Sequence, residues 1–274
     1  MAVKLSEFMR ATERLWPSAL AESWDAPGLI TGSAEQEISR VLLTVDITKA
    51  VIDEAIDGAF DLVLAHHPYL MRGVSSLSEQ TAKGAVLTKA IRHGIAIFAA
   101  HTNADVVESG VSATLARAFG LSQLKPLVPM TGQPEIGHGR IGTLPEPISL
   151  GDFARRIAAV IPPTASGVRV SGDYDRVIRL VALCGGAGDS FIPEAVSQSA
   201  DVYVTSDLRH HVTQDVAELS ELGLVGPAII DISHWAAESL WLETAAGELN
   251  AIFEGLQVVA SQLRTDPWDF VVTQ

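Results

Sequence analysis

The segment Asp61-Leu62-Val63-Leu64-Ala65-His66-His67-Pro68 is an apolar run closed by two adjacent histidines. The run has the composition of a buried β-strand, and imidazole is the commonest metal ligand in proteins. Neighbouring strand residues point to opposite faces, but the chain turns at a strand end, so both rings can line one cavity. We therefore expect His66 and His67 to bind metal. The alternative is a pair of hydrogen-bonded loop histidines.

Two other apolar runs also end in polar residues that can bind metal. Residues 41–45 precede Asp46, and residues 95–100 precede His101, with helix-like stretches between the runs. Strands that alternate with helices indicate βαβ units and a largely parallel sheet, and such sheets bind ligands beyond the carboxyl ends of their strands. We predict an α/β fold of two α/β domains, with mostly parallel strands, flanking helices and a metal site beyond the C-terminal strand ends.

The second half of the chain repeats this pattern after a stretch rich in Gly and Pro, about 126–147. That stretch is predicted to be a linker or domain boundary. We expect residues 1–125 with 228–274 to form the metal-site domain, and residues 126–227 to form a second, smaller α/β domain. Helices are predicted near the N-terminus, with Ser6 as a cap, and over Leu150–Val160, with Ser149 as its cap.

Two pairs of ligand-type residues have informative spacing. His101 and Asp105 follow a strand-like run, so Asp105 is a candidate metal ligand and His101 a candidate ligand or orienting group. Alternatively, Asp105 caps a helix that begins near Val106. His234 and Glu238 lie four residues apart, which places them on one helix face. That spacing suits joint coordination of an ion, although exposed polar pairs of this kind are common.

Other polar residues near strand ends are more ambiguous. Asp207, His210 and His211 follow an apolar run and are candidates for a substrate-facing or orienting role, with a solvated loop as the alternative. The stretch Gly185–Gly188 is better explained as a tight turn than as a phosphate cradle, because it matches neither the dinucleotide nor the Walker motif. The single cysteine, Cys184, is predicted to be a small core residue.

Composition excludes several classes of protein. The chain of 274 residues is 47% apolar and 19% charged, which indicates a globular protein rather than a disordered one. Its net charge of -14 disfavours nucleic acid and anionic membranes as partners. No apolar stretch approaches the roughly 20 residues that span a bilayer. The single cysteine and the lack of an apparent signal peptide lead us to expect a cytoplasmic protein.

The order of these motifs resembles the NIF-three-like family, also called GTP cyclohydrolase 1 type 2 homologues, which are hexameric proteins with a dinuclear metal centre. The matching pieces span nearly the whole chain: Trp24-Asp25 with Gly28-Leu29, Asp46-Ile47-Thr48, His66-His67-Pro68, His101-Thr102-Asn103-Ala104-Asp105, Gly185-Gly186-Ala187-Gly188, Asp207 with His210-His211, and His234 with Glu238. The chain departs from the family pattern at Ala26, Ser206 and Ser233, where Asn, Gly and Gly are usual.

The resemblance implies that two divalent ions are held by His66, His67, Asp105, His234 and Glu238. Mixed imidazole and carboxylate ligands suit Zn, Fe, Mn, Co or Ni. The resemblance also implies a toroidal homohexamer and a nucleotide-like substrate such as GTP.

The expected function is therefore that of a metal-dependent hydrolase, with His101, His210 and His211 as candidates for proton transfer. The alternatives are a non-enzymatic metal-binding or regulatory protein and a metal-dependent phosphoesterase. Turnover by the metal-loaded protein would discriminate between them.

Overall fold

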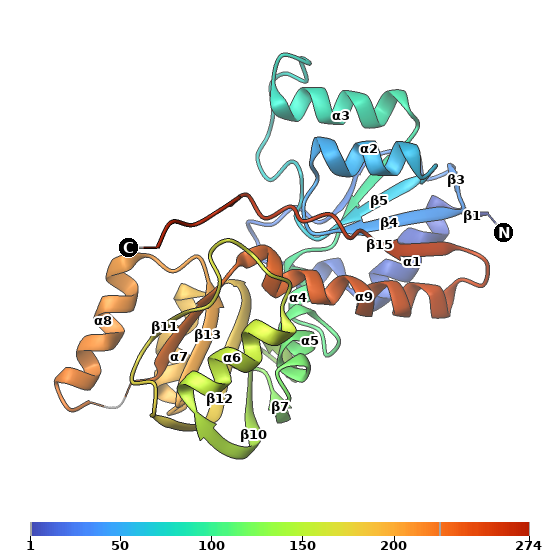
Figure 1. Ribbon diagram of the computed structural model, residues 1–274. Helices are drawn as coiled ribbons and strands as arrows, with labels where there is room; N and C mark the ends of the chain where they lie inside the picture. Colours follow the sequence, from blue (N-terminus) through green and yellow to red (C-terminus); the bar gives the residue numbers. More distant parts are fainter. Residues whose placement is uncertain (1, 225, 274) are drawn as a thin grey trace. The chain divides into compact units, whose positions relative to one another are not determined.

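The structure is a computed structural model that describes residues 2–224 and 226–273. Its residues form two compact units, each with its own sheet and covering helices (Figure 1). The first unit extends to Ala104 and includes Leu242–Thr265. The second comprises Asp105–Trp241 and the residues from Asp266 onward. The predicted α/β class is confirmed.

The first unit is built on a five-stranded sheet of order β15-β4-β5-β6-β2, in which β2 alone is antiparallel to its neighbour within the described residues. Its elements are β1 (Val3–Lys4), α1 (Leu5–Leu15), the 3-10 helix η1 (Ser18–Leu20), β2 (Gly28–Thr31), β3 (Glu37–Ile38), β4 (Arg40–Thr44), α2 (Lys49–Asp57), β5 (Leu62–Ala65), α3 (Ala82–Arg92), β6 (Ala96–Ala99) and β15 (Gln257–Ala260).

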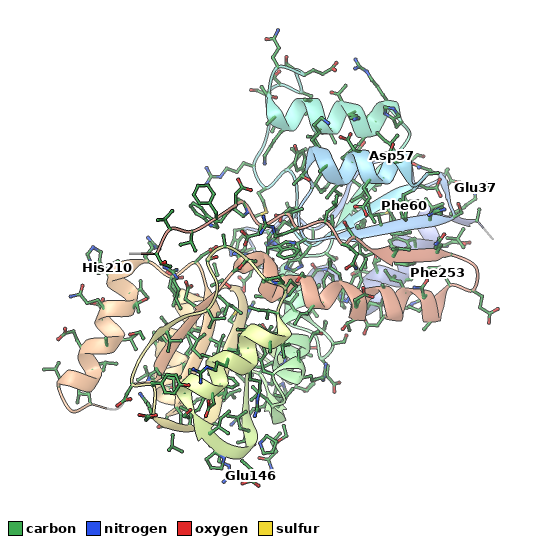
Figure 2. The ribbon with its side chains drawn as sticks, viewed as in Figure 1. Glu37, Asp57, Phe60, Glu146, His210 and Phe253 are labelled. Carbon is green, nitrogen blue, oxygen red and sulfur yellow. The ribbon has the colours of Figure 1, made fainter. Side chains whose placement is uncertain are left out.

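Helices cover both faces of this sheet because its central strands are apolar on both sides. All four residues of β5 are buried, as are all four of β6. Helices α2 and α3 pack their apolar residues against one face (Figure 1). On α1, the Phe8 ring contacts Phe98 of β6 edge-to-face and stacks on Phe253. Phe60 is nearly buried, whereas the charged Glu37 and Asp57 are exposed (Figure 2).

The second unit is built on a six-stranded mixed sheet of order β11-β14-β13-β12-β10-β7, with β12, β13 and β14 parallel. Its elements are α4 (Thr102–Asp105, shared with the first unit), α5 (Val111–Ala118), β7 (Ser122–Lys125), β8 (Val128–Met130), β9 (Gln133–His138), β10 (Arg140–Ser149), α6 (Leu150–Val160), β11 (Arg169–Ser171), β12 (Val177–Ala187), η2 (Asp189–Phe191), α7 (Ile192–Ser197), β13 (Val202–Ser206), α8 (His210–Glu221), β14 (Ala228–Ile232) and the start of α9 (His234–Ile252).

Two apolar clusters lie on opposite faces of this second sheet. Helices α5 and α6 and the first turn of α9 pack on one face, where Phe119 and Phe153 meet edge-to-face. Helices α7 and α8 pack on the other face around the buried Tyr203. Ser149 caps α6 as predicted, because its hydroxyl accepts a hydrogen bond from the Asp152 amide. Both faces are therefore apolar, as expected for a sheet covered by helices.

Several expectations about local structure are wrong. The stretch 126–147 is not a linker but contains the β8–β9 hairpin and most of β10. Gly137 serves close packing, because a Cβ there would lie 2.1 Å from the carbonyl oxygen of Val128. Ser6 does not cap α1, which begins at Leu5 with Lys4 at the N-cap. The two compact units divide near residues 105 and 241, and α5 and β7 pack with the second sheet.

None of the helices in the described part of the chain is both long enough and apolar enough to serve as a membrane span.

Candidate metal centre

Three imidazoles gather beyond the carboxyl ends of β5 and β6 in the first unit. His66 and His67 come directly after β5 in the chain, and His101 comes shortly after β6. Their ring centroids lie 5.2 to 5.4 Å apart, and each ring offers a nitrogen within 4.8 Å of the others. His66 is fully buried and the other two rings are partly exposed. Because β5 and β6 are parallel neighbours, their ends deliver these side chains to one place.

Each of these rings is oriented by an oxygen at Nδ1. His66 Nδ1 donates to the Ala100 carbonyl oxygen at 2.9 Å, and His67 Nδ1 donates to Asp46 Oδ1 at 2.7 Å. His101 Nδ1 donates to Asp25 Oδ1 at 2.8 Å. In the neutral rings the proton is therefore on Nδ1 and the lone pair is on Nε2. A carbonyl or carboxylate behind each imidazole is the usual arrangement around histidines that bind metal.

Asp25 fixes the loop that holds His101 in place. Its second carboxylate oxygen accepts hydrogen bonds from the backbone amide and the hydroxyl of Thr102, at 3.1 and 2.5 Å. Burial opposes ionisation of Asp25, but the hydrogen bonds from His101 and Thr102 outweigh it and lower its pKa to about 2. Asp25 is therefore a carboxylate at neutral pH and keeps the His101 ring in one orientation.

In the second unit, His234 and Glu238 lie on adjacent turns at the start of α9, as their spacing predicted. His234 Nε2 is 2.9 Å from Glu238 Oε1, and His234 Nδ1 donates to Asp207 Oδ2 at 2.6 Å. Burial acts to lower the pKa of His234, but the charge of Glu238 and the hydrogen bonds with Asp207 and Glu238 raise it to about 11. Two carboxylates around one imidazole make this a place that attracts a positive charge.

The backbone around this pair is shaped for close approach. Gly186 has φ +74, and a Cβ there would lie 2.6 Å from Glu238 Oε1 and 3.3 Å from His234 Nε2. Strand β12 runs on to Ala187, so the tight turn predicted over Gly185–Gly188 is wrong for its first residues. Ser233, where the family pattern has Gly, caps α9 by accepting from the Ala236 amide at 3.2 Å. Ser233 is not one of the residues with a positive φ angle in the described part of the chain.

Asp105 is the last residue of the short helix α4, which starts at Thr102 directly after His101. The helix that Asp105 was alternatively expected to cap does not begin at Val106; α5 begins at Val111 with Gly110 at its N-cap. The backbone after Asp105 is fixed by the buried Arg140, whose guanidinium donates to the carbonyls of Val106 and Val107 at 3.3 and 2.6 Å. The same guanidinium also donates to two glycine carbonyls.

The remaining sequence candidates lie elsewhere in the second unit. His210 and His211 are the first two residues of α8, with ring centroids 5.3 Å apart. They stand in a helix rather than in the solvated loop that was the alternative. Figure 2 labels His210 at the start of this helix. Cys184 is buried in the core, as predicted. Burial and the nearby charge of Asp105 raise the pKa of its thiol to about 12, so it is not a thiolate ligand at neutral pH.

From the sequence, Asp46 is only a strand-end residue that can bind metal, and Asp25 is only part of a motif that carries the resemblance. In the structure each holds a candidate metal-binding ring. The position of Asp46 directly after a strand was a usable signal, because β4 is the parallel neighbour of β5. Asp25 lies in an irregular segment 76 residues before His101 and carried no such signal. Imidazole nitrogens and carboxylate oxygens without thiolate are the donor set of a divalent transition-metal site, so the residues present fit such an ion.

Comparison with known proteins places the chain in a family. The family model described as Duf34/NIF3 (NGG1p interacting factor 3) matches residues 3–267. A Streptomyces coelicolor protein named GTP cyclohydrolase 1 type 2 homolog is 40% identical, with 97% of this chain and 93% of that protein aligned. A Mycobacterium leprae protein of the same name is 32% identical, with 98% and 96% aligned.

A solved structure agrees with these sequence matches. The crystal structure of a Bacillus cereus protein related to NIF3 superposes with a TM-score of 0.89 at 26% identity, covering 98% of this chain and 99% of that one. Because the family model and the aligned relatives extend over nearly the entire chain, the assignment does not depend on one segment. The chain belongs to the Duf34/NIF3 (NGG1p interacting factor 3) family.

Proposed function

We propose that this protein binds divalent metal ions and acts as a metal-dependent hydrolase on a nucleotide-like substrate. The observation that carries the proposal is the cluster of His66, His67 and His101, whose Nδ1 atoms all donate to oxygen acceptors. That pattern sets the same tautomer in three neighbouring rings. Three loop histidines with no common task would have no physical reason to share it.

The proposed ligands of two ions are His66, His67, Asp105, His234 and Glu238. Asp46 and Asp207 support this assignment, because each accepts the Nδ1 proton of a proposed ligand and so favours coordination through Nε2. When bound, such ions supply Lewis acidity, lower the pKa of water toward about 7 and stabilise negative charge on oxygen. His101 is proposed to orient or to move a proton, held in place by Asp25.

Proton transfer elsewhere is proposed for His210 and His211. Both lie at the exposed start of α8, three and four residues after Asp207, whose carboxylate holds His234. The two ring nitrogens of an imidazole can accept and donate a proton, which suits it to such transfer. The assignment is tested by the pH dependence of turnover in single alanine variants.

A nucleotide-like substrate is proposed from the name shared by the relatives, GTP cyclohydrolase 1 type 2 homolog. The net charge of -14 repels a free nucleotide over most of the surface, so productive binding requires local positive charge. Divalent ions at the proposed centre would provide that charge. The family resemblance also supports the proposal of a homohexamer, which native mass measurement tests directly.

The deciding experiment is a turnover assay on metal-loaded protein offered GTP, other nucleotides and phosphodiesters. We expect product formation from a nucleotide, and its loss in His66→Ala and Glu238→Ala. His93→Ala is the matched control, because His93 is exposed at the C-terminus of α3, where its Nδ1 contacts the Lys89 carbonyl. Hydrolysis of phosphodiesters alone would identify a phosphoesterase. Metal binding without turnover of any substrate would identify a metal-binding or regulatory protein and contradict the proposed enzyme.

A further inference from the structure

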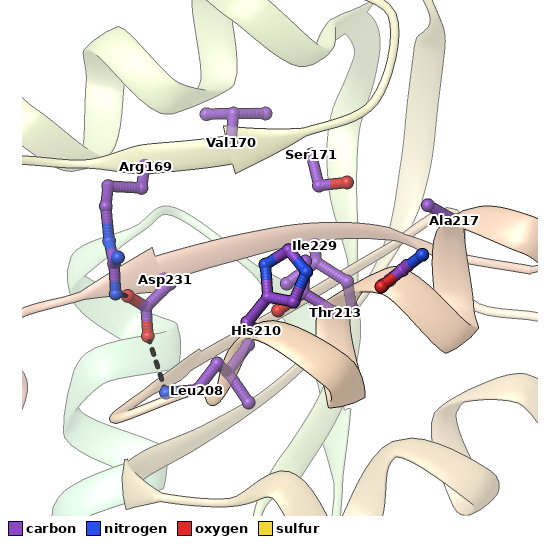
Figure 3. Close-up of a pocket in the computed structure, with 10 residues that line it drawn as sticks. Arg169, Val170, Ser171, Leu208, His210, Thr213, Ala217, Ile229 and Asp231 are labelled. Carbon is purple, nitrogen blue, oxygen red and sulfur yellow. Dashed lines mark hydrogen bonds and ion pairs between the residues drawn. The ribbon is translucent and has the colours of Figure 1, made fainter.

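A cavity of about 370 Å³ lies in the second unit, between α8 and the strands β11 and β14 (Figure 3). This volume is at the lower end of the range of roughly 300–1,000 Å³ that is usual for small-molecule sites. It suits one ring system better than a whole nucleotide. The lining residues come from these elements and from the loop before α8: Arg169, Val170, Ser171, Leu208, His210, Thr213, Gln214, Ala217, Ile229 and Asp231.

One face of α8 lines this cavity. His210, Thr213, Gln214 and Ala217 follow the spacing i, i+3, i+4, i+7, which places them on the same side of the helix. A helix that packs on a sheet normally presents apolar side chains along this stripe. Here three of the four are polar and the fourth is small. The apolar contacts of α8 come instead from another stripe, which contains Val216 of the core cluster. The polar stripe of α8 therefore does not pack tightly on the sheet, and the cavity lies between the two.

The opposite wall of the cavity is formed by paired positions on the two strands. Arg169 and Asp231 are cross-strand partners, as are Ser171 and Ile229. The Arg169 guanidinium forms an ion pair with Asp231 Oδ2, while Asp231 Oδ1 accepts a hydrogen bond from the Leu208 amide at 3.2 Å (Figure 3). Both oxygens of Asp231 are therefore used to build the wall. Ile229, which is 2% exposed, provides an apolar floor.

This lining indicates the chemical class of the ligand. The single positive charge, on Arg169, is balanced by Asp231, so the cavity is not built for a phosphate. It offers an apolar floor together with hydroxyl, amide, imidazole and guanidinium groups around the rim. Such a combination suits a neutral planar heterocycle whose edge carries both donors and acceptors. Arginine pairs with O6 and N7 of guanine, and glutamine pairs with N6 and N7 of adenine, so these two side chains together suit the edge of a purine.

We propose that this cavity is the subsite for the purine base, guanine in the first instance, of the nucleotide-like substrate. This inference rests on the proposed function. The loop that ends at the cavity supports it. Asp207, which holds His234, is followed directly by Leu208, whose amide is tied to Asp231 in the cavity wall. Asp207 has φ +58, an uncommon conformation for a residue other than glycine. A base in the cavity would thus lie one residue from a group that orients a proposed metal ligand.

The test is calorimetric titration of the metal-loaded protein with guanosine, which carries the base and the sugar but no phosphate. Gln214→Ala and Ala217→Leu, which remove an amide and fill space, should each raise the Kd for guanosine at least tenfold. Asp215→Ala is the matched control, because Asp215 is exposed on the same helix and does not line the cavity. Its Kd should stay within twofold of the wild-type value.

Thr213→Val separates hydrogen bonding from shape, because it replaces a hydroxyl with a methyl group at nearly constant volume. It should raise the Kd for guanosine about threefold or more. Unchanged guanosine binding in all three cavity variants would overturn the proposal, as would displacement of guanosine by inorganic phosphate. The two proposals fail separately. If GTP is turned over but the Kd for guanosine is unchanged in the cavity variants, the subsite alone is refuted. Cavity-dependent guanosine binding without turnover of any nucleotide refutes the hydrolase alone.

Discussion

The Nδ1 atom of His67 donates to Oδ1 of Asp46 at 2.7 Å, and Oδ2 of the same carboxylate accepts from the Thr265 hydroxyl at 2.6 Å. Asp46 is thereby fixed on both oxygens, and the ring of His67 is fixed with it. The pair is formed because β4 and β5 are adjacent parallel strands that end at the same edge of the sheet. A carboxylate held in this way favours the tautomer of His67 that coordinates through Nε2.

Asp46→Asn should therefore weaken metal binding by about 10- to 100-fold, the usual effect of removing the group behind a metal-binding histidine. The amide keeps the size of the side chain but loses the charge that orients the ring. Zinc affinity, measured by competition with a chromogenic chelator, checks this. Asp57→Asn, at an exposed position at the end of α2, is the control. Equal affinities in the two variants would show that Asp46 does not support a ligand.

Gly186→Ala should reduce metal content, because the new methyl group would meet Glu238 Oε1 at 2.6 Å. It also places a side chain at φ +74, a conformation that costs roughly 1–2 kcal/mol for residues other than glycine. Gly94→Ala is the control for the backbone effect alone. Gly94 has φ +70, but nothing lies within 4 Å of the added Cβ. Both variants should lose stability in urea denaturation, but only Gly186→Ala should lose metal. Equal metal loss in the two variants would contradict the assignment.

Arg140→Lys should destabilise the second unit by at least about 2 kcal/mol, because a lysine cannot reach the four carbonyls that the guanidinium now satisfies. Burial lowers the pKa of Arg140 to about 10, yet the group stays charged at neutral pH. The free energy of unfolding in urea measures the effect. Arg179→Lys, at an exposed position of β12, should change it little. A stability loss as small as the control's would mean that these carbonyls find other donors.

Cys184 should react slowly with thiol reagents in the native protein and fast after unfolding. Burial, followed by the charge of Asp105, raises its pKa from 9.0 to about 12, so the thiolate is scarce in the folded state. The unfolded chain ionises near pH 9.0, and stability attributable to this thiol is therefore present below pH 9.0 and lost as pH rises toward 12. The rate of modification at pH 8 measures this. A native rate equal to the unfolded rate would contradict the burial of Cys184.

The sequence predicted the parallel strands and the residues that follow them because apolar runs ending in polar residues carry a strong local signal. His66, His67 and His101 follow such runs, and the structure brings their rings together. The α9 pair of His234 and Glu238 followed from helical spacing alone, and the two side chains are in contact. Strand ends and helix faces are local properties of the chain, which is why they were accessible without a structure.

Features that depend on tertiary packing were not accessible in the same way. The Asp25–His101 contact joins residues 76 positions apart, and no spacing rule connects them. The stretch at 126–147 looked like a linker because Gly and Pro mark breaks, yet Gly137 serves the close approach of β9 to β8. The run at Gly185 and Gly186 looked like a turn, but strand β12 continues through it. Its glycines serve close packing instead, because neighbouring side chains leave no room for a Cβ.

The proposed function requires that the histidines beyond β5 and β6 belong to a centre that binds divalent metal. The most direct test is elemental analysis of the untagged protein after incubation with Zn, Mn or Fe and removal of unbound ions. We expect about two divalent ions per chain, the stoichiometry of paired-ion sites, and a clear loss of metal in His66→Ala but not in His93→Ala. A protein that stays metal-free under all three conditions, or that binds equally well without His66, would contradict it.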